Sequence, residues 1–105
     1  MEWNPNSSIP DDFFAVANKV YQDDSYWIPE NKSKISQQFS INNDYFKANR
    51  SWVHFSENNR LCGFFEPANV INGKKSAYFG FWETTDHFEE NQKSFSDLEN
   101  WAKNL

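Results

Sequence analysis

The chain has 105 residues, a formal net charge of −5 and a pI of about 4.9, which suits one domain with one core. Aromatic residues make up 19% of the chain, against 38% for all hydrophobic residues. Rings must therefore build the core, since each buries about 150–250 Å², and a disordered chain is excluded. No run of Lys and Arg offsets the acidic charge, so nucleic acid is not expected as a partner.

The numbers and spacing of cysteine and histidine exclude several kinds of site. Cys62 is the sole cysteine, so neither an intramolecular disulfide nor a cysteine-based zinc site can form. His54 and His87 do not have the spacing of a helical ligand pair, and no metal is expected. No stretch approaches the ~18 apolar residues of a membrane span, and no basic-then-apolar leader opens the chain. These features predict a cytoplasmic protein without a membrane segment.

The first half of the chain predicts two helices. Residues 1–8 read as a loose lead-in, and a helix is predicted from about Asp11 to Tyr21 because its apolar residues recur at helical spacing. These residues are Phe13, Val16, Ala17 and Val20. A weaker helical pattern follows over residues 30–41. Residues 42–44 then carry turn chemistry, and residues 45–46 could add one helical turn.

Three strands are predicted next, over residues 52–55, 61–65 and 77–82, as an antiparallel meander. The second is apolar enough to be buried on both faces and is expected to end at Pro67. Asn72-Gly73 predicts a tight hairpin turn before the third.

Side chains in the third strand are expected to alternate between the two faces of the sheet. Tyr78 and Trp82 would then share one face, and Phe79 and Phe81 the other. Gly80 could mark a bulge or a close approach of two backbones.

A final helix is predicted from Ser94, where Ser94-Phe95-Ser96-Asp97 reads as a capping box after a polar loop. Phe95, Leu98, Ala102 and Leu105 form its apolar stripe, which runs to the last residue and so suggests a truncated domain. The predicted fold class is therefore α+β: helices first, an antiparallel meander of about three strands, and a C-terminal helix packed on the sheet.

Three segments carry a resemblance to a known family. Y-Q-D-D-S-Y-W-I-P at residues 21–29, the hairpin at residues 51–65, and Y-F-G-F-W-E at residues 78–83 with the helix after it resemble an uncharacterised bacterial branch of the GNAT N-acetyltransferases. The resemblance implies a partial acyl-CoA N-acyltransferase fold, with residues 1–105 as a single N-terminal half-domain. It also implies acetyl-CoA or another acyl-CoA as cofactor, and Glu83 as the general base, made more basic by its aromatic neighbours.

The loop after this strand departs from the family. Catalytic members carry a glycine-containing loop whose backbone N–H groups bind the acyl-CoA pyrophosphate. Residues 84–94 contain no glycine, and Asp86, Glu89 and Glu90 would repel phosphate. The chain is therefore expected to be inactive alone, as a truncated or split domain that needs a protein partner or a dimer formed through its open sheet edge.

Two other functions fit the same residues. One is a non-catalytic, inhibitor-like interaction module whose acidic face binds a basic protein. The other is a binder of small apolar ligands, with a pocket lined by Tyr78, Trp82 and Trp27. Glu83 could equally be a solvated carboxylate at a strand end, and the aromatic residues could simply be core.

Overall fold

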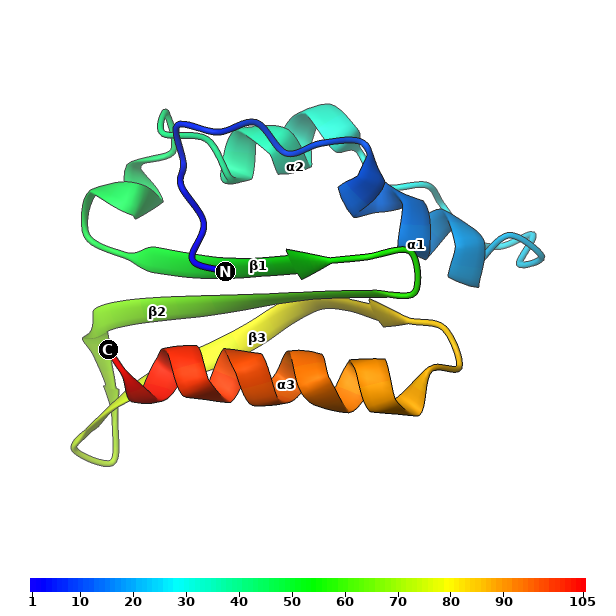
Figure 1. Cartoon of the computed structure of the whole chain (residues 1–105). Helices are drawn as coiled ribbons and strands as arrows, with labels where there is room; N and C mark the ends of the chain where they lie inside the picture. The colour runs from blue at the N-terminus through cyan, green and yellow to red at the C-terminus, as the bar shows by residue number, and fades with distance from the viewer.

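Three antiparallel strands form the centre of the molecule, with helices on both faces (Figure 1). The computed structural model describes residues 1–105. Its elements, in chain order, are α1 (Asp12–Val20), α2 (Lys32–Gln38), the 3₁₀ helix η1 (Asp44–Lys47), β1 (Arg50–Phe55), β2 (Asn59–Ile71), β3 (Lys74–Thr84) and α3 (Phe88–Lys103). The α+β class, the meander and the C-terminal helix on the sheet are confirmed. No helix is both long and apolar enough to cross a membrane.

Alternate residues of the strands supply two separate cores. Val53 and Cys62 point to the side of α1 and α2, where they join five further buried residues: Trp3, Ile9, Phe13, Phe14 and Phe39. Trp52 and Leu61 point to the other side, where they pack against Leu98 of α3. Because successive side chains of a strand leave opposite faces, β2 is buried on both faces, as predicted.

Residues 1–3 are attached to the sheet, so the prediction of a loose lead-in over residues 1–8 was wrong for them. Trp3 is 6% exposed, and its indole Nε1 donates to the carbonyl of Phe39 at 2.7 Å. The amide of Trp3 also donates to Ser51, and that of Val53 to Met1, at 2.9 and 2.8 Å. Residues 1–3 therefore cover the outer edge of β1, and that edge of the sheet is closed.

The second strand runs past Pro67 to Ile71, so the prediction that this proline ends it was wrong. The pairing of β2 with β3 shifts between Phe65 and Val70, and this irregularity lies at Pro67, which has no N–H to donate to a ladder. The predicted turn at Asn72-Gly73 is confirmed. Both residues have positive φ, 51° and 76°, as the central pair of a type I′ hairpin turn requires.

A β-bulge in β3 changes which aromatic residues share a face. Cys62 pairs with Gly80 and Arg60 with Glu83, so the two residues between Gly80 and Glu83 lie opposite Leu61 alone. Phe81 has a φ of 53°, and the extra residue shifts the alternation by one place.

This shift overturns the predicted faces of the third strand. Tyr78 and Phe81 both pack near Phe64 on the side of α1 and α2. Phe79 and Trp82 both pack on Phe95 of α3. The expectation that Tyr78 shares a face with Trp82, and Phe79 with Phe81, was wrong, although Gly80 does lie beside a bulge as anticipated.

The last helix begins at Phe88 rather than at Ser94. The predicted capping box therefore lies inside the helix, where Ser94 is buried and its hydroxyl donates to the carbonyl of Asn91 at 2.8 Å. The first turns carry Glu89 and Glu90 and almost no apolar residue, so hydrophobic spacing did not reveal them. Of the predicted loop at residues 84–94, only residues 85–87 separate strand and helix.

One buried charge connects the sheet to the layer that contains α1 and α2. Arg60 is 1% exposed, and its guanidinium forms a two-point ion pair with Glu30 at 2.8 and 3.0 Å. It also donates to the carbonyl of Phe13 in α1 at 3.1 Å and to the carbonyl of Phe81 at the bulge at 2.9 Å. The rings of Phe13 and Phe81 lie 4.6 and 5.8 Å from the guanidinium carbon. This charge is fully paired, as a buried charge must be.

We predict that Glu30→Ala lowers the free energy of unfolding by about 2–4 kcal/mol, because the buried guanidinium loses its counterion. Urea denaturation measures the change. Glu57→Ala is the matched control, since Glu57 is 86% exposed and lies 4.0 Å from Lys19; its effect should stay below about 0.5 kcal/mol. Equal effects of the two substitutions would contradict the assignment of Arg60 as a buried, paired charge.

A second prediction concerns the packing of α3 on β2. A Cβ placed on Gly63 would collide with the Leu98 side chain and lie 3.0 Å from Trp101. Gly63→Ala should therefore destabilise by about 1–3 kcal/mol, and Leu98→Ala by about 2–5 kcal/mol. The double variant should lose less than the sum, because Leu98→Ala makes room for the new methyl group. Strict additivity in chemical denaturation would contradict this packing.

Candidate functional site

Glu83, the base implied by the resemblance, lies half-buried at the end of β3 beside the end of α1. Its carboxylate accepts a hydrogen bond from the hydroxyl of Tyr21 at 3.3 Å, and the ring of Tyr21 stacks on Trp27 with centroids 5.2 Å apart. That hydrogen bond and the negative charge of Glu83 raise the pKa of Tyr21. A shallow hollow of about 320 Å³ is lined here by Val20, Tyr21, Trp82, Glu83 and Thr84. Sequence reasoning placed Glu83 at a strand end but missed its partner, Tyr21.

The connection from β3 to α3 presents negative charge at the place where the resemblance would put a phosphate site for acyl-CoA. Glu89 and Glu90 occupy the first turn of α3. The Glu90 carboxylate is held by the hydroxyl of Ser56 and by Asn58 Nδ2. The hydrogen bond from Ser56 is the main cause of its lowered pKa. A fixed carboxylate at a helix N-terminus occupies the position that favours anions, so this turn disfavours pyrophosphate.

Cys62 and His54 lie within the sheet and offer no reactive group to solvent. Burial raises the pKa of the Cys62 thiol to about 12, which keeps it protonated and unreactive at neutral pH. Burial also lowers the pKa of His54, whose ring stacks on Trp52 with centroids 6.2 Å apart. No three His, Cys, Asp or Glu side chains lie together as a metal site would require.

A pocket of about 370 Å³ lies between η1 and the strands, on the side of α1 and α2. Six of its eight lining residues are aromatic: Phe39, Tyr45, Phe46, Phe64, Tyr78 and Phe81, with Gln38 and Asn43 beside them. Gly80 lies beside one of these rings, since a Cβ there would lie 3.3 Å from the Phe64 ring. We call this group the aromatic pocket.

The structure does not bring the three predicted pocket residues together. Tyr78 lines the aromatic pocket, whereas Trp82 lies on the opposite face of β3, where its indole donates to Asn91 of α3 at 2.8 Å. Trp27 stacks on Tyr21 near Glu83. The sequence predicted a helical turn at residues 45–46, which η1 confirms, but it did not place Tyr45 and Phe46 in a pocket.

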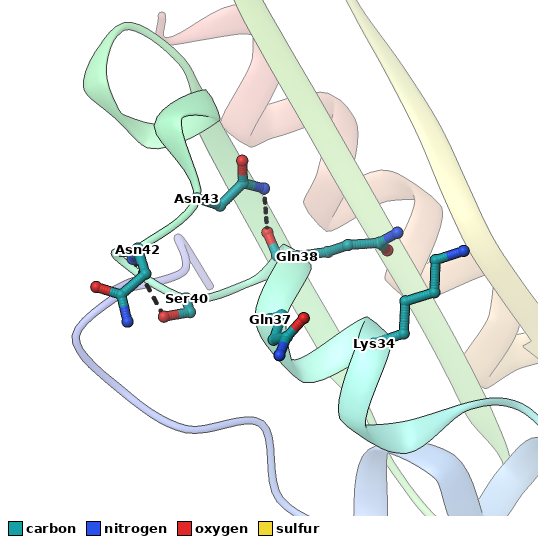
Figure 2. Close-up of a pocket in the computed structure, with 6 residues that line it drawn as sticks. All are labelled: Lys34, Gln37, Gln38, Ser40, Asn42 and Asn43. Carbon is teal, nitrogen blue, oxygen red and sulfur yellow. Dashed lines mark hydrogen bonds between the residues drawn. The ribbon is translucent and has the colours of Figure 1, made fainter.

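Figure 2 shows a larger polar groove of about 490 Å³. It adjoins the aromatic pocket, with which it shares Gln38 and Asn43. Its lining contains no apolar residue and consists of Lys34, Gln37, Gln38, Ser40, Asn42 and Asn43. Asn43 Nδ2 donates to the carbonyl of Gln38 at 2.7 Å and so ties the turn to the end of α2. Most of these side chains are solvent-exposed, so the groove alone specifies no ligand chemistry.

The outer edge of β3 has no backbone partner. The sheet order is β1-β2-β3, and residues 1–3 cover only the β1 edge. The backbone groups of Ser51 and Val53 in β1 point outward and bond to residues 1–3. Their partners in β2, Phe64 and Cys62, therefore point their own N–H and C=O groups toward β3. In β3, Tyr78 pairs with Phe64 and Gly80 pairs with Cys62, so the backbone groups of Tyr78 and Gly80 point back to β2. The N–H and C=O groups of Ala77 and Phe79 therefore point into solvent.

Large apolar side chains flank this open edge. Tyr78 is 47% exposed, Phe79 53% and Trp82 44%. An exposed strand edge that also carries apolar side chains is a template for pairing with another strand. Lys74 and Lys75 are the only charges on the first half of β3, and they lie at its hairpin end.

Comparison with known proteins does not identify a family. No protein-family model, curated protein or solved structure matches the chain.

We predict that Glu83→Gln lowers the pKa of Tyr21 toward its ordinary value. The raised value arises because the phenol donates to a carboxylate and because its anion would be repelled by that charge. Titration of the Tyr21 Cζ resonance by NMR measures the shift, with Tyr26, which is 93% exposed, as the internal control. An unchanged Tyr21 titration would show that the hydrogen bond to Glu83 does not form.

Proposed function

We propose that this chain is a protein-interaction module that works as a pair, with the open edge of β3 joined to the same edge of a second copy. The observation that supports the proposal is an unpaired strand edge flanked by exposed aromatic side chains. The opposite edge of the sheet is covered by residues 1–3. Association at the β3 edge would satisfy free backbone groups and bury apolar surface together.

The register of such a pairing follows from β3 itself. We propose a pairing whose two-fold axis passes through a hydrogen-bonded pair of outward-facing residues, for which the candidates are Lys75, Ala77 and Phe79. A centre at Lys75 would place two ammonium groups directly opposite each other. A centre at Phe79 would place Ala77 against the bulged residue Phe81, whose φ of 53° breaks the strand. Of these three candidates, the centre at Ala77 avoids both.

The pairing centred on Ala77 also brings complementary side chains together. Ala77 would exchange both of its free backbone hydrogen bonds with Ala77 of the second copy. Lys75 would then lie opposite Phe79, where its ammonium can rest on a ring face. The small side chain at the centre lets the strands approach without a clash.

Acyl transfer is a second candidate, and the order of the elements favours it. Helices, three strands and a final helix follow one another as the resemblance to N-acyltransferases implies, and Glu83 lies at the end of β3 with Tyr21 beside it. The carboxylates in the first turn of α3 weigh against acyl-CoA. The interaction module is therefore the better supported function.

Light scattering should give twice the 12.5 kDa chain mass for the wild type and the single-chain mass for Ala77→Pro. Proline removes an N–H that faces solvent within the monomer, so the β2–β3 ladder is retained. Ala77→Thr is the matched control, because it keeps the N–H and suits a strand, and it should remain paired. A single-chain mass for the wild type at every concentration, or a paired Ala77→Pro, would contradict the proposal.

Thermal melting of the same samples with and without acetyl-CoA tests the second candidate function, acyl transfer. A ligand that binds the folded state raises the melting temperature. An unchanged melting temperature supports a module without acyl-CoA chemistry. A rise in the wild type would instead restore acyl transfer and make Glu83→Gln the next variant.

A further inference from the structure

We propose that the aromatic pocket binds an organic cation, a methylated ammonium group of the choline type. The pocket lies on the side of α1 and α2, away from Phe79 and Trp82. The inference draws on its ring lining, the charges around it and the absence of any cation among its lining residues.

The ring of Tyr45 meets two neighbouring rings of the pocket at steep angles. Tyr45 stands at 86° to Phe64 with ring centroids 6.4 Å apart, and at 83° to Phe46 with centroids 5.3 Å apart. Phe64 stacks on Tyr78 at an interplanar angle of 27°, with ring centroids 5.4 Å apart. Rings that line one pocket at different angles can turn several faces to it, and each face carries partial negative charge. A cation seated among them is attracted by each ring.

The charged groups near the pocket favour a cation. The hydroxyl of Tyr78, which lines the pocket, donates to the Glu66 carboxylate at 2.6 Å, so a negative charge lies within hydrogen-bond distance of a lining residue. The hydroxyl of Tyr45 is buried without a hydrogen-bond partner. Burial, with the nearby Tyr78 and Glu66, raises the pKa of Tyr45. Lys34 lines only the adjoining polar groove, and the whole chain carries a net charge of −5.

A ligand that is apolar on its surface and positive at its centre matches both features. Methyl groups around an ammonium can fill a ring-lined volume without leaving buried N–H donors unpaired, and the positive charge complements Glu66. A neutral apolar molecule would use the rings but gain nothing from the carboxylate. An anion would be repelled by Glu66 and would find no cation in the pocket.

Titration of the ¹⁵N-labelled full chain with choline chloride at constant ionic strength tests the inference. The matched probe is 3,3-dimethylbutan-1-ol, which has the shape of choline with carbon in place of nitrogen. Choline should shift the amide signals of Tyr45, Phe64, Tyr78 and Phe81 saturably. Its dissociation constant should be about tenfold lower than that of the alcohol, because only choline carries the charge.

Two single-charge variants separate the local carboxylate from the net charge. Glu66→Gln should weaken choline binding by about threefold or more and leave the alcohol unaffected. Glu99→Gln removes the same charge from an exposed position on α3 and should change neither. Thermal melting of both variants verifies that they are folded. Equal affinity for choline and the alcohol, equal effects of the two variants, or no saturable shift with choline would each overturn the assignment.

Discussion

The buried guanidinium of Arg60 is the interaction on which the rest of the structure depends. It is held by Glu30 from the connection between α1 and α2, by the carbonyl of Phe13 in α1, and by the carbonyl of Phe81 in β3. Removing any one of these partners would leave part of a charge unpaired in the interior, which is costly. The helical layer and the bulged strand are thereby fixed to the same group.

The bulge that Arg60 secures decides what each face of β3 presents. Because the alternation of side chains shifts at Phe81, Phe81 joins Tyr78 beside the aromatic pocket, and Trp82 joins Phe79 against α3. The same bulge ends the regular part of the open edge, which limits pairing with another strand to the residues before it. The edge and the pocket therefore both follow from one irregularity in the sheet.

Local signals in the sequence predicted what local physics determines. The stripe of Phe13, Val16 and Ala17 predicted α1, and Asn72-Gly73 predicted the hairpin turn. The class and the meander followed from such segments. Other features depend on contacts between residues distant along the chain, such as that between Trp3 and Phe39. These features are the attachment of residues 1–3 to the sheet, the bulge and the partners of Arg60. Local periodicity carries no information about such contacts.

The candidate sites also combine features predicted from local sequence with features that depend on distant contacts. Glu83 was recognised as a strand-end carboxylate, but its hydrogen bond to Tyr21 spans 62 positions of the chain. The ring-rich composition predicted aromatic surfaces, yet the pocket proposed from Tyr78, Trp82 and Trp27 required the unbulged strand.

Backbone amide hydrogen exchange at Ala77 and Phe79, followed over protein concentration, tests the central claim that the β3 edge is a pairing surface. Both amides should exchange freely in dilute solution and become protected as concentration rises, while Tyr78 and Gly80 stay protected throughout. Exchange at Ala77 and Phe79 that is independent of concentration would contradict it.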